Sequence, residues 1–334
     1  MKAQVLERIA PIEDGPLKYS SVDDPKMRSR DVLIEIKACG VCHSNLHMIE
    51  GEFRVFGVPS KLPIIPGHEV TGIVACVGTD VKKWRAGDRV GVQVLHEACG
   101  SCEFCQTSRE QLCVNKNITG ETVDGGYAEM IAAPSDYIYS VPENLDIEEA
   151  APLFCPGVTA YRAVKRAGVR MGNTIVVMGV GGVGHMSLQF AKLAGAEVIA
   201  VDKSRGALGL AKELGADVTI PPNELDEYVS KHGHPDAVFV HAPAQPAIDQ
   251  AFRSVKRGGV VLMAVLGSAS IVFPEEYSVV TSAIGTRSDM METLKIAAMG
   301  KVRVKSKSFP LSDATEILGR LKRGEITGRA VLVP

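Results

Sequence analysis

The strongest constraint on the fold is a glycine-rich segment between an expected strand and an expected helix. Residues 174–178 form a continuous apolar run, which is typical of a parallel strand buried on both faces. Gly179, Gly181 and Gly184 follow at once, and a helical pattern begins by residue 186. Further strand-like and helical stretches alternate after it. This order predicts an open parallel sheet with helices on both faces.

The same segment predicts a dinucleotide site, because an acid follows the next strand. The second apolar run, 197–201, ends at Asp202. The glycines allow backbone to approach a pyrophosphate, and the helix N-terminus faces the phosphates. The Asp202 carboxylate can accept both ribose hydroxyls and would repel a 2′-phosphate, so NAD(H) is favoured over NADP(H), although Lys203 and Arg205 lie close. The residues expected to contact the cofactor here are Gly179, Gly181, Gly182, Val183, Gly184, Asp202, Lys203 and Val265.

Four cysteines lie close together with the spacing Cys-x2-Cys-x2-Cys-x7-Cys, namely Cys99, Cys102, Cys105 and Cys113. In a reducing compartment such clustering indicates metal rather than disulfides. Four thiolates complete a tetrahedral zinc and leave no open position, so the site would be structural. The bacterial iron–sulfur run has a shorter last spacing and a proline after it, whereas Val114 follows here. We expect a structural zinc, with an iron–sulfur cluster or unmetallated thiols as alternatives.

A second group of metal-binding side chains lies in residues 39–47, directly after an apolar run. A catalytic zinc takes three protein ligands and keeps one open position, so this segment needs ligands from elsewhere. His68, in Gly-His-Glu before an expected strand, is the best second ligand. Cys155 is a third candidate at the head of an expected helix, although its spacing alone favours a buried structural cysteine. Ser44 is the expected N-cap of a short helix.

Composition limits the classes of protein that this chain can represent. Its 334 residues favour two domains, and its proportions of 46% hydrophobic and 23% charged residues are ordinary. The net charge of −2 gives no general attraction to nucleic acid or to an anionic membrane. Residues 1–7 contain no apolar stretch of signal-peptide length, and no apolar run could span a bilayer. We expect a cytosolic (cytoplasmic) protein that binds neither nucleic acid nor membrane.

Several motifs occur here in one order: Cys-Gly-Val-Cys-His-Ser, Gly-His-Glu, the four cysteines, Asp-Gly-Gly-Tyr-Ala-Glu and Gly-Val-Gly-Gly-Val-Gly. Together they resemble the zinc-dependent medium-chain alcohol dehydrogenases, nearest the bacterial and yeast type, over about Lys2 to Leu332. The resemblance implies an α/β protein with two domains. These are a mainly-β, GroES-like catalytic domain over 1–156 and 289–334, with a structural zinc lobe at 95–117, and a Rossmann domain with a doubly wound parallel sheet over 157–288.

The resemblance also implies roles at the catalytic zinc, the second of two zinc ions per chain. Its ligands would be Cys42, His68 and Cys155. Glu69 matches an acid that can approach the metal. Ser44 matches the hydroxyl that touches the substrate oxygen.

Four more positions match cofactor or relay residues of that family. His47 matches the far end of a proton relay that runs through the nicotinamide ribose. His43 matches a residue that faces the cofactor phosphates. Thr159 would lie beside the nicotinamide ring, and Arg329 near the pyrophosphate.

Two positions depart from the family pattern. Asn45 stands where an aspartate of that family is usually hydrogen-bonded to the metal-bound histidine. An amide can still accept from the imidazole N–H, but it adds no negative charge. Loss of such a carboxylate can weaken metal binding or activity by roughly tenfold or more. Val94 stands where bulky aromatic residues are common, so a larger or branched substrate is expected to fit.

The implied activity is NAD-dependent oxidation of an alcohol to an aldehyde or ketone, by a homo-oligomer that is a dimer or a tetramer. The nearest alternative is a polyol, amino-alcohol or hydroxyacyl dehydrogenase of the same superfamily. Two alternatives belong to other classes. One is a redox-inactive NAD-sensing protein, suggested by Asn45. The other is a zinc ribbon that binds nucleic acid or a partner protein, which the acidic residues of the cysteine lobe disfavour.

Overall fold

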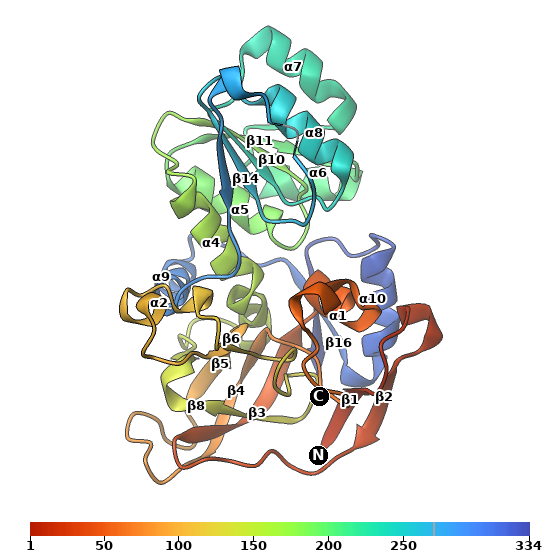
Figure 1. Ribbon diagram of the computed structural model, residues 1–334, viewed down its shortest axis with the longest axis vertical. Helices are drawn as coiled ribbons and strands as arrows, with labels where there is room; N and C mark the ends of the chain where they lie inside the picture. The colour runs from red at the N-terminus through yellow and green to blue at the C-terminus, as the bar shows by residue number, and fades with distance from the viewer. Residues whose placement is uncertain (270) are drawn as a thin grey trace. The chain divides into compact units, whose positions relative to one another are not determined.

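The computed structural model describes residues 1–269 and 271–334 and shows two compact units (Figure 1). The first unit comprises Met1–Cys155, Thr286–Ala298 and Val304–Pro334. The second comprises Pro156–Gly285 and Met299–Arg303. The first unit is therefore built from pieces distant in sequence, and the short segment Met299–Arg303 belongs to the second unit rather than to the first.

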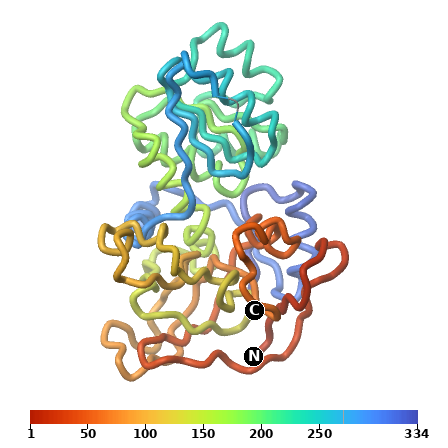
Figure 2. Tube along the Cα trace, in the orientation of Figure 1, coloured from red at the N-terminus to blue at the C-terminus, as the bar shows by residue number. Residues whose placement is uncertain are grey.

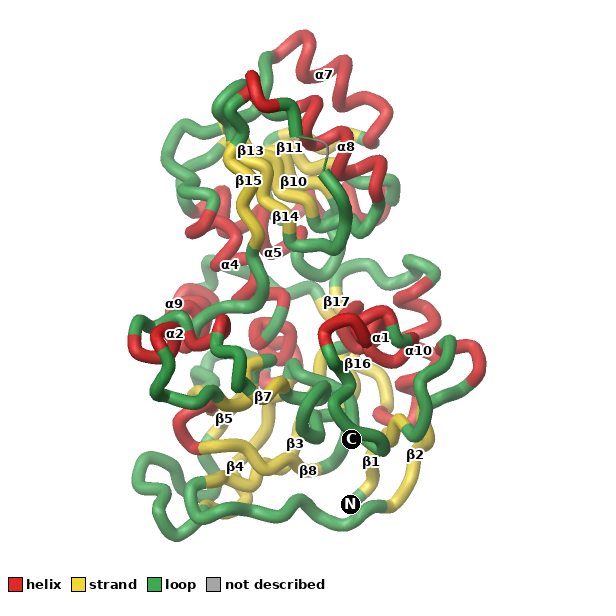
Figure 3. Tube along the Cα trace, viewed as in Figure 1, coloured by secondary structure: helices red, strands yellow, loops and turns green. Residues whose placement is uncertain are grey.

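The second unit contains the expected parallel sheet, with strand order β12-β11-β10-β13-β14-β15 and helices on both sides of the strands (Figure 3). Its strands are apolar because both faces are covered, as for Val176 and Val238, which are 0% exposed. The strand order reverses between β10 and β13, which is where ligands bind in open α/β sheets. The elements are α4 (Pro156–Arg166), β10 (Thr174–Met178), α5 (Gly184–Leu193), β11 (Glu197–Val201), α6 (Arg205–Glu213), β12 (Val218–Ile220), α7 (Leu225–His232), β13 (Ala237–Val240), α8 (Gln245–Ser254), β14 (Val260–Met263) and β15 (Ser278–Thr281).

The first unit is built on a mainly antiparallel sheet with the order β16-β17-β3-β4-β5-β9, in which β8 also pairs with β3. Its core is a continuous apolar cluster that includes Ile34, Val74, Val90 and Trp84. Its strands are β1 (Lys2–Leu6), β2 (Leu17–Ser21), β3 (Asp31–Gly40), β4 (Val70–Val77), β5 (Arg89–Val92), β6 (Leu95–Glu97), β7 (Asn117–Ile118), β8 (Met130–Pro134), β9 (Ile138–Ser140), β16 (Ser306–Pro310) and β17 (Arg329–Val333). Its helices are α1 (His43–Glu50), α2 (Glu103–Gln106), α3 (Ile147–Ala150), α9 (Arg287–Ala298) and α10 (Ala314–Lys322).

The register of this sheet gathers three distant segments at one end of β3. Cys39, near the end of β3, pairs with Val70 at the start of β4 and with Leu332 of β17. Figure 2 shows the C-terminal β17 running beside the N-terminal β3. The residues just after β3, just before β4 and at the start of β17 are therefore neighbours.

The N-cap of helix α1 lies two residues earlier than predicted. Its N-cap is Cys42, not Ser44, and no side chain caps it. The helix ends at Gly51, whose φ of +88° suits a glycine at this position. Because Cys42 has extended backbone before the first turn, its thiol is free to point toward β4 rather than cap the helix.

Among the described residues, no helix combines the length and the apolar character needed to cross a bilayer.

Candidate metal and dinucleotide sites

Four buried side chains of the first unit bring potential metal ligands together. One donor atom from each of Cys42, His68, Glu69 and Cys155 lies within 4.8 Å of all the others. The Cys42 and Cys155 Sγ atoms are 3.9 Å apart. Two thiolates on a tetrahedral zinc, each at about 2.3 Å, would be roughly 3.8 Å apart. The donor set and its spacing therefore fit a zinc ion.

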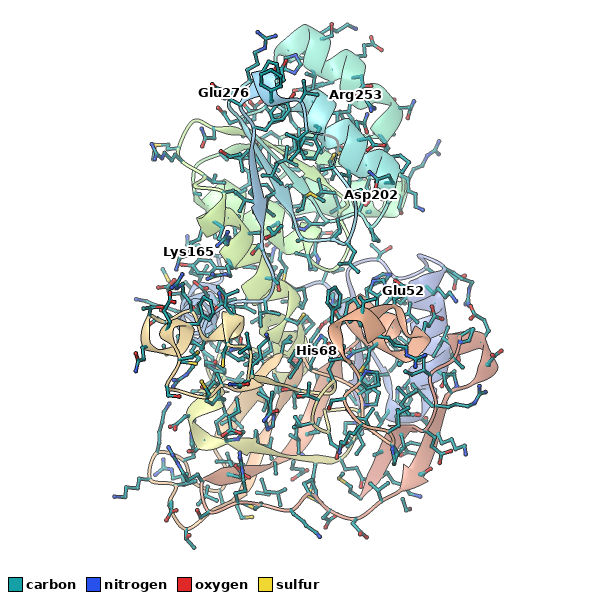
Figure 4. All side chains as sticks on the ribbon, in the orientation of Figure 1. Glu52, His68, Lys165, Asp202, Arg253 and Glu276 are labelled. Carbon is teal, nitrogen blue, oxygen red and sulfur yellow. The ribbon has the colours of Figure 1, made fainter. Side chains whose placement is uncertain are left out.

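The ring of His68, labelled in Figure 4, has one nitrogen without a partner. His68 is only 1% exposed, so water does not reach its Nε2, and this atom has no hydrogen-bond partner among the described residues. Buried polar atoms in proteins are nearly always satisfied, so this nitrogen is placed as a metal ligand would be. The other nitrogen, Nδ1, lies 3.3 Å from Asn45 Nδ2 and 3.6 Å from Glu121 Oε1.

Glu69 and Arg329 form a buried ion pair beside these ligands. A Cβ on Gly40 would lie 1.9 Å from Glu69 Oε2, so the end of β3 must be a glycine to admit the carboxylate. Burial raises the pKa of Glu69 to about 7, against the opposing effect of Arg329. Arg329, which was predicted to lie near a pyrophosphate, has its guanidinium on Glu69, and its cofactor contact stays a prediction.

Without a metal, the contacts within the cluster favour protonated forms of His68 and Cys155. The pKa of Cys42 is lowered, first by its hydrogen bond with Cys155 and then by His68. The pKa of Cys155 is raised by the same hydrogen bond and by burial. Burial lowers the pKa of His68, but Cys42 and Glu121 outweigh it and raise the pKa to about 10. A bound metal would displace these protons.

The predicted relay residues lie on and beside α1. Ser44 Oγ is 3.6 Å from Cys42 Sγ, which places the hydroxyl at the metal ligands. His47 Nδ1 lies 2.8 Å from a carboxylate oxygen of Glu52, and its ring centroid is 6.0 Å from that of His43. Ser44, His43 and His47 thus lie along one short helix.

The four clustered cysteines converge as predicted. Cys102 and Cys105 have Sγ atoms 3.5 Å apart, and those of Cys99 and Cys105 are 3.9 Å apart. All four donor atoms lie within 4.8 Å of one another, and each cysteine is free of a disulfide. Backbone N–H groups of Ser101 and Cys102 lower the pKa of Cys99 to about 6. Four thiols at these separations fit the ligand set of a closed tetrahedral zinc site.

The glycine-rich turn of the second unit has the form expected for a pyrophosphate site. Gly179 has a φ of +91°, and a Cβ on Gly184 would lie 1.8 Å from the Gly179 carbonyl oxygen. A Cβ on Gly181 would meet nothing within 4 Å, so this position faces open space. Asp202 accepts hydrogen bonds from the Val180 N–H at 2.7 Å and the Ser204 N–H at 2.8 Å. The acid therefore stands beside the turn.

The remaining predicted cofactor residues belong to the same unit. Thr159 is buried on α4, Val265 follows β14, and Lys203 is exposed after β11. Their contacts with a cofactor stay predictions, as do those of Gly182 and Val183.

Sequence reasoning missed two features of the site. Glu121 belongs to no recognised motif, and only its position in the fold brings it to His68. The pairing of Glu69 with Arg329 joins residues 260 positions apart, which no local pattern could indicate.

Comparison with known proteins identifies the family. Residues 28–143 match the alcohol dehydrogenase GroES-like domain, and residues 182–299 match the zinc-binding dehydrogenase domain. An alcohol dehydrogenase of Geobacillus stearothermophilus is 44% identical over 327 residues, covering 95% of each chain. The crystal structure of an alcohol dehydrogenase from Aeropyrum pernix superposes with a TM-score of 0.93 at 30% identity over all of both chains.

A cobalt- and zinc-bound alcohol dehydrogenase from Pyrobaculum aerophilum gives a TM-score of 0.90 at 27% identity, covering 100% of this chain and 99% of that one. These matches confirm the α/β fold with a GroES-like and a Rossmann-like domain. The chain belongs to the zinc-binding alcohol dehydrogenase family.

Proposed function

We propose that this protein oxidises an alcohol reversibly to an aldehyde or ketone, with NAD(H) as the hydride carrier. One observation carries the proposal: Cys42, His68 and Cys155 converge in a buried cluster with zinc-like spacing. This convergence and the family membership favour the enzyme over the alternative of a redox-inactive NAD-sensing protein.

Some residues of this chain would bind the metal, and others would transfer protons. When bound, zinc would supply a Lewis acid for the substrate oxygen, and the nicotinamide would supply the hydride acceptor. Cys42, His68 and Cys155 would hold the metal. Ser44 would relay the proton of the alcohol hydroxyl by giving up its own hydroxyl proton as it accepts that one, and His47, beside Glu52, would pass a proton to solvent.

The second zinc would be held by the four cysteines of the lobe. A closed site of this kind contributes folding energy rather than chemistry. The lobe is tied to the rest of the first unit, since the Arg287 N–H at the start of α9 donates to the Glu110 carboxylate at 2.8 Å. Two zinc ions per chain are therefore proposed.

NAD(H) is proposed over NADP(H) because of the carboxylate at the glycine-rich turn. Asp202 would repel a 2′-phosphate, whereas a ribose diol could donate hydrogen bonds to it. The exposed Lys203 would weaken this preference.

The substrate is proposed to be larger or more branched than a short primary alcohol. Val94, a small side chain at 6% exposure, occupies a position where the family commonly has an aromatic ring. Phe53 lies near His47, with their ring centroids 5.2 Å apart, and Phe56 lies against Phe53, with centroids 5.7 Å apart. A polyol, amino-alcohol or hydroxyacyl compound remains the alternative substrate class.

A homo-oligomer, dimer or tetramer, is proposed to form through β15. This strand is at one edge of the parallel sheet, and Val279 on it is 38% exposed. An open strand edge with apolar side chains can pair with the same edge of a second copy. Light scattering after size exclusion should give a mass of two or four chains, and a monomer would contradict this.

The activity is tested by following NAD⁺ reduction with primary, secondary, cyclic and aromatic alcohols, with and without a chelator. Cys42→Ala should abolish turnover and leave NADH binding unchanged. Near-normal rates in that variant would show that the metal ligands are misassigned. A preference for a polyol over every simple alcohol would support the alternative substrate class instead.

A further inference from the structure

We propose that Glu121 is a positioning residue for the metal site: its carboxylate orients His68 and supplies the negative charge that Asn45 lacks. The proposal rests on the proposed function only in that Cys42, His68 and Cys155 hold the metal. It assigns a role to a side chain that lies in no metal or cofactor motif.

The geometry around His68 indicates that Glu121 is the hydrogen-bond acceptor for its second ring nitrogen, Nδ1. If Nε2 binds the metal, the neutral ring carries its proton on Nδ1, which then needs an acceptor. Asn45 presents its amide nitrogen, a donor, at 3.3 Å from Nδ1, while its Oδ1 accepts from the Tyr127 hydroxyl at 3.2 Å. The acceptor that faces Nδ1 is Glu121 Oε1, at 3.6 Å.

This separation is an ion-pair distance that a small movement turns into a hydrogen bond. N–H···O bonds are typically about 2.7–3.2 Å long, so a shift of roughly 0.5 Å closes the pair. Glu121 is only 6% exposed, and a buried carboxylate is costly unless it is paired. Glu121 forms an ion pair with His68.

The chain builds this contact with a tight turn. Gly120 has a φ of +73°, and a Cβ there would lie 2.6 Å from both the nitrogen and the oxygen of Gly67. The turn is thus seated directly on the residue before His68. The Glu121 N–H donates to the Ile118 carbonyl at 3.2 Å, and its carbonyl accepts from the Ser60 N–H at 3.1 Å. Backbone contacts on both sides hold the glutamate in place.

The charge of the site explains why a carboxylate is useful. Two thiolates and a neutral imidazole only balance the charge of a zinc ion. A carboxylate on the second ring nitrogen makes the imidazole more basic and fixes its orientation, and losing such a partner typically weakens metal binding about 10–100-fold. Asn45 cannot supply this charge, whereas Glu121 can.

The test measures zinc affinity in the full chain rather than activity. Glu121→Gln keeps the size of the side chain and removes its charge, and competition with a chromophoric chelator reports how tightly each zinc is held. We expect the zinc of the Cys42–His68–Cys155 site to bind about tenfold more weakly or worse, and the zinc of the four-cysteine lobe to be unchanged. Glu143→Gln, at a side chain that is 89% exposed, is the matched control.

Rescue distinguishes positioning from a structural role. Asn45→Asp in the Glu121→Gln background restores a carboxylate to Nδ1 and should recover most of the affinity. In the unmodified background Asn45→Asp should gain less than about threefold, because Glu121 already fills the role. The electronic spectrum of the cobalt-substituted site should shift in Glu121→Gln and return in the double variant.

The outcomes separate this proposal from the function. Unchanged zinc affinity in Glu121→Gln, or no recovery in the double variant, would overturn the role of Glu121 and leave the alcohol dehydrogenase proposal intact. If Glu121→Gln does not fold, Asn45→Asp alone decides, since a tenfold gain would show that Glu121 is idle. A protein whose metal content is unaffected by Cys42→Ala would instead refute the metal site itself.

Discussion

Replacing Arg329 by methionine should destabilise the first unit by leaving a buried charge without its counterion. The side chains of Arg329 and Glu69 are 4% and 0% exposed in their ion pair. Removing one partner of a buried pair typically costs about 3–5 kcal/mol, because the other charge stays uncompensated. We expect a loss of up to this size at pH 8, where Glu69 is ionised and paired in the wild-type protein.

The loss should shrink as the pH falls. Burial raises the pKa of Glu69 to about 7 in the metal-free protein, above its ordinary value of 4.5. A group with a raised folded-state pKa stabilises the fold fully below its unfolded-state pKa, and this contribution disappears as the pH rises through the folded value. Without Arg329 the pKa of Glu69 rises further, so the variant goes on losing stability as the pH rises above about 7, where the wild type no longer does.

The assay uses the single tryptophan of the chain, Trp84, which is buried in the core of the first unit. Its fluorescence during urea unfolding of chelator-treated protein reports this unit alone. Removing both charges, in Glu69→Gln/Arg329→Met, should recover most of the loss. The exposed pair partner Arg323, replaced by methionine, should change little. If Arg329→Met is as stable as wild type at pH 8, the pair does not contribute as argued.

Three further outcomes are expected. Gly184→Ala should destabilise the second unit by several kcal/mol in thermal unfolding, because its Cβ would overlap the Gly179 carbonyl. Gly181→Ala should unfold like wild type, yet it should bind NADH more weakly in a fluorescence titration. Cys99→Ser should lower the zinc content by one ion per chain and reduce the melting temperature, and an unchanged metal content would count against a closed zinc lobe. Asp202→Ala should raise kcat/KM for NADP⁺ relative to NAD⁺, and an unaltered ratio would show that the carboxylate does not select the cofactor.

The parallel-sheet unit could be predicted from sequence because its signals are local. The apolar run of β10, the glycines and Asp202 all lie within about thirty residues, and each has one structural reading. The predicted N-cap of α1 was wrong by two residues, also for a local reason. Ser44 is a good N-cap in general, but here Cys42 occupies that position with extended backbone.

The metal cluster could be predicted only in part. Spacing alone indicated the four-cysteine lobe, whereas Cys42, His68 and Cys155 were assigned together through resemblance. The register of β3 and β4 brings the segments of Cys42 and His68 together, and Cys155 joins them from the segment before α4. Glu121 reaches His68 because the turn at Gly120 packs against Gly67, and no sequence pattern predicts that contact.

Metal analysis of wild type beside His68→Ala tests the central claim most directly. The account predicts two zinc ions per wild-type chain and one in the variant, with loss of alcohol-dependent NAD⁺ reduction and retention of NADH binding. A variant that still carries two zinc ions, or that still oxidises alcohols at the wild-type rate, would contradict it.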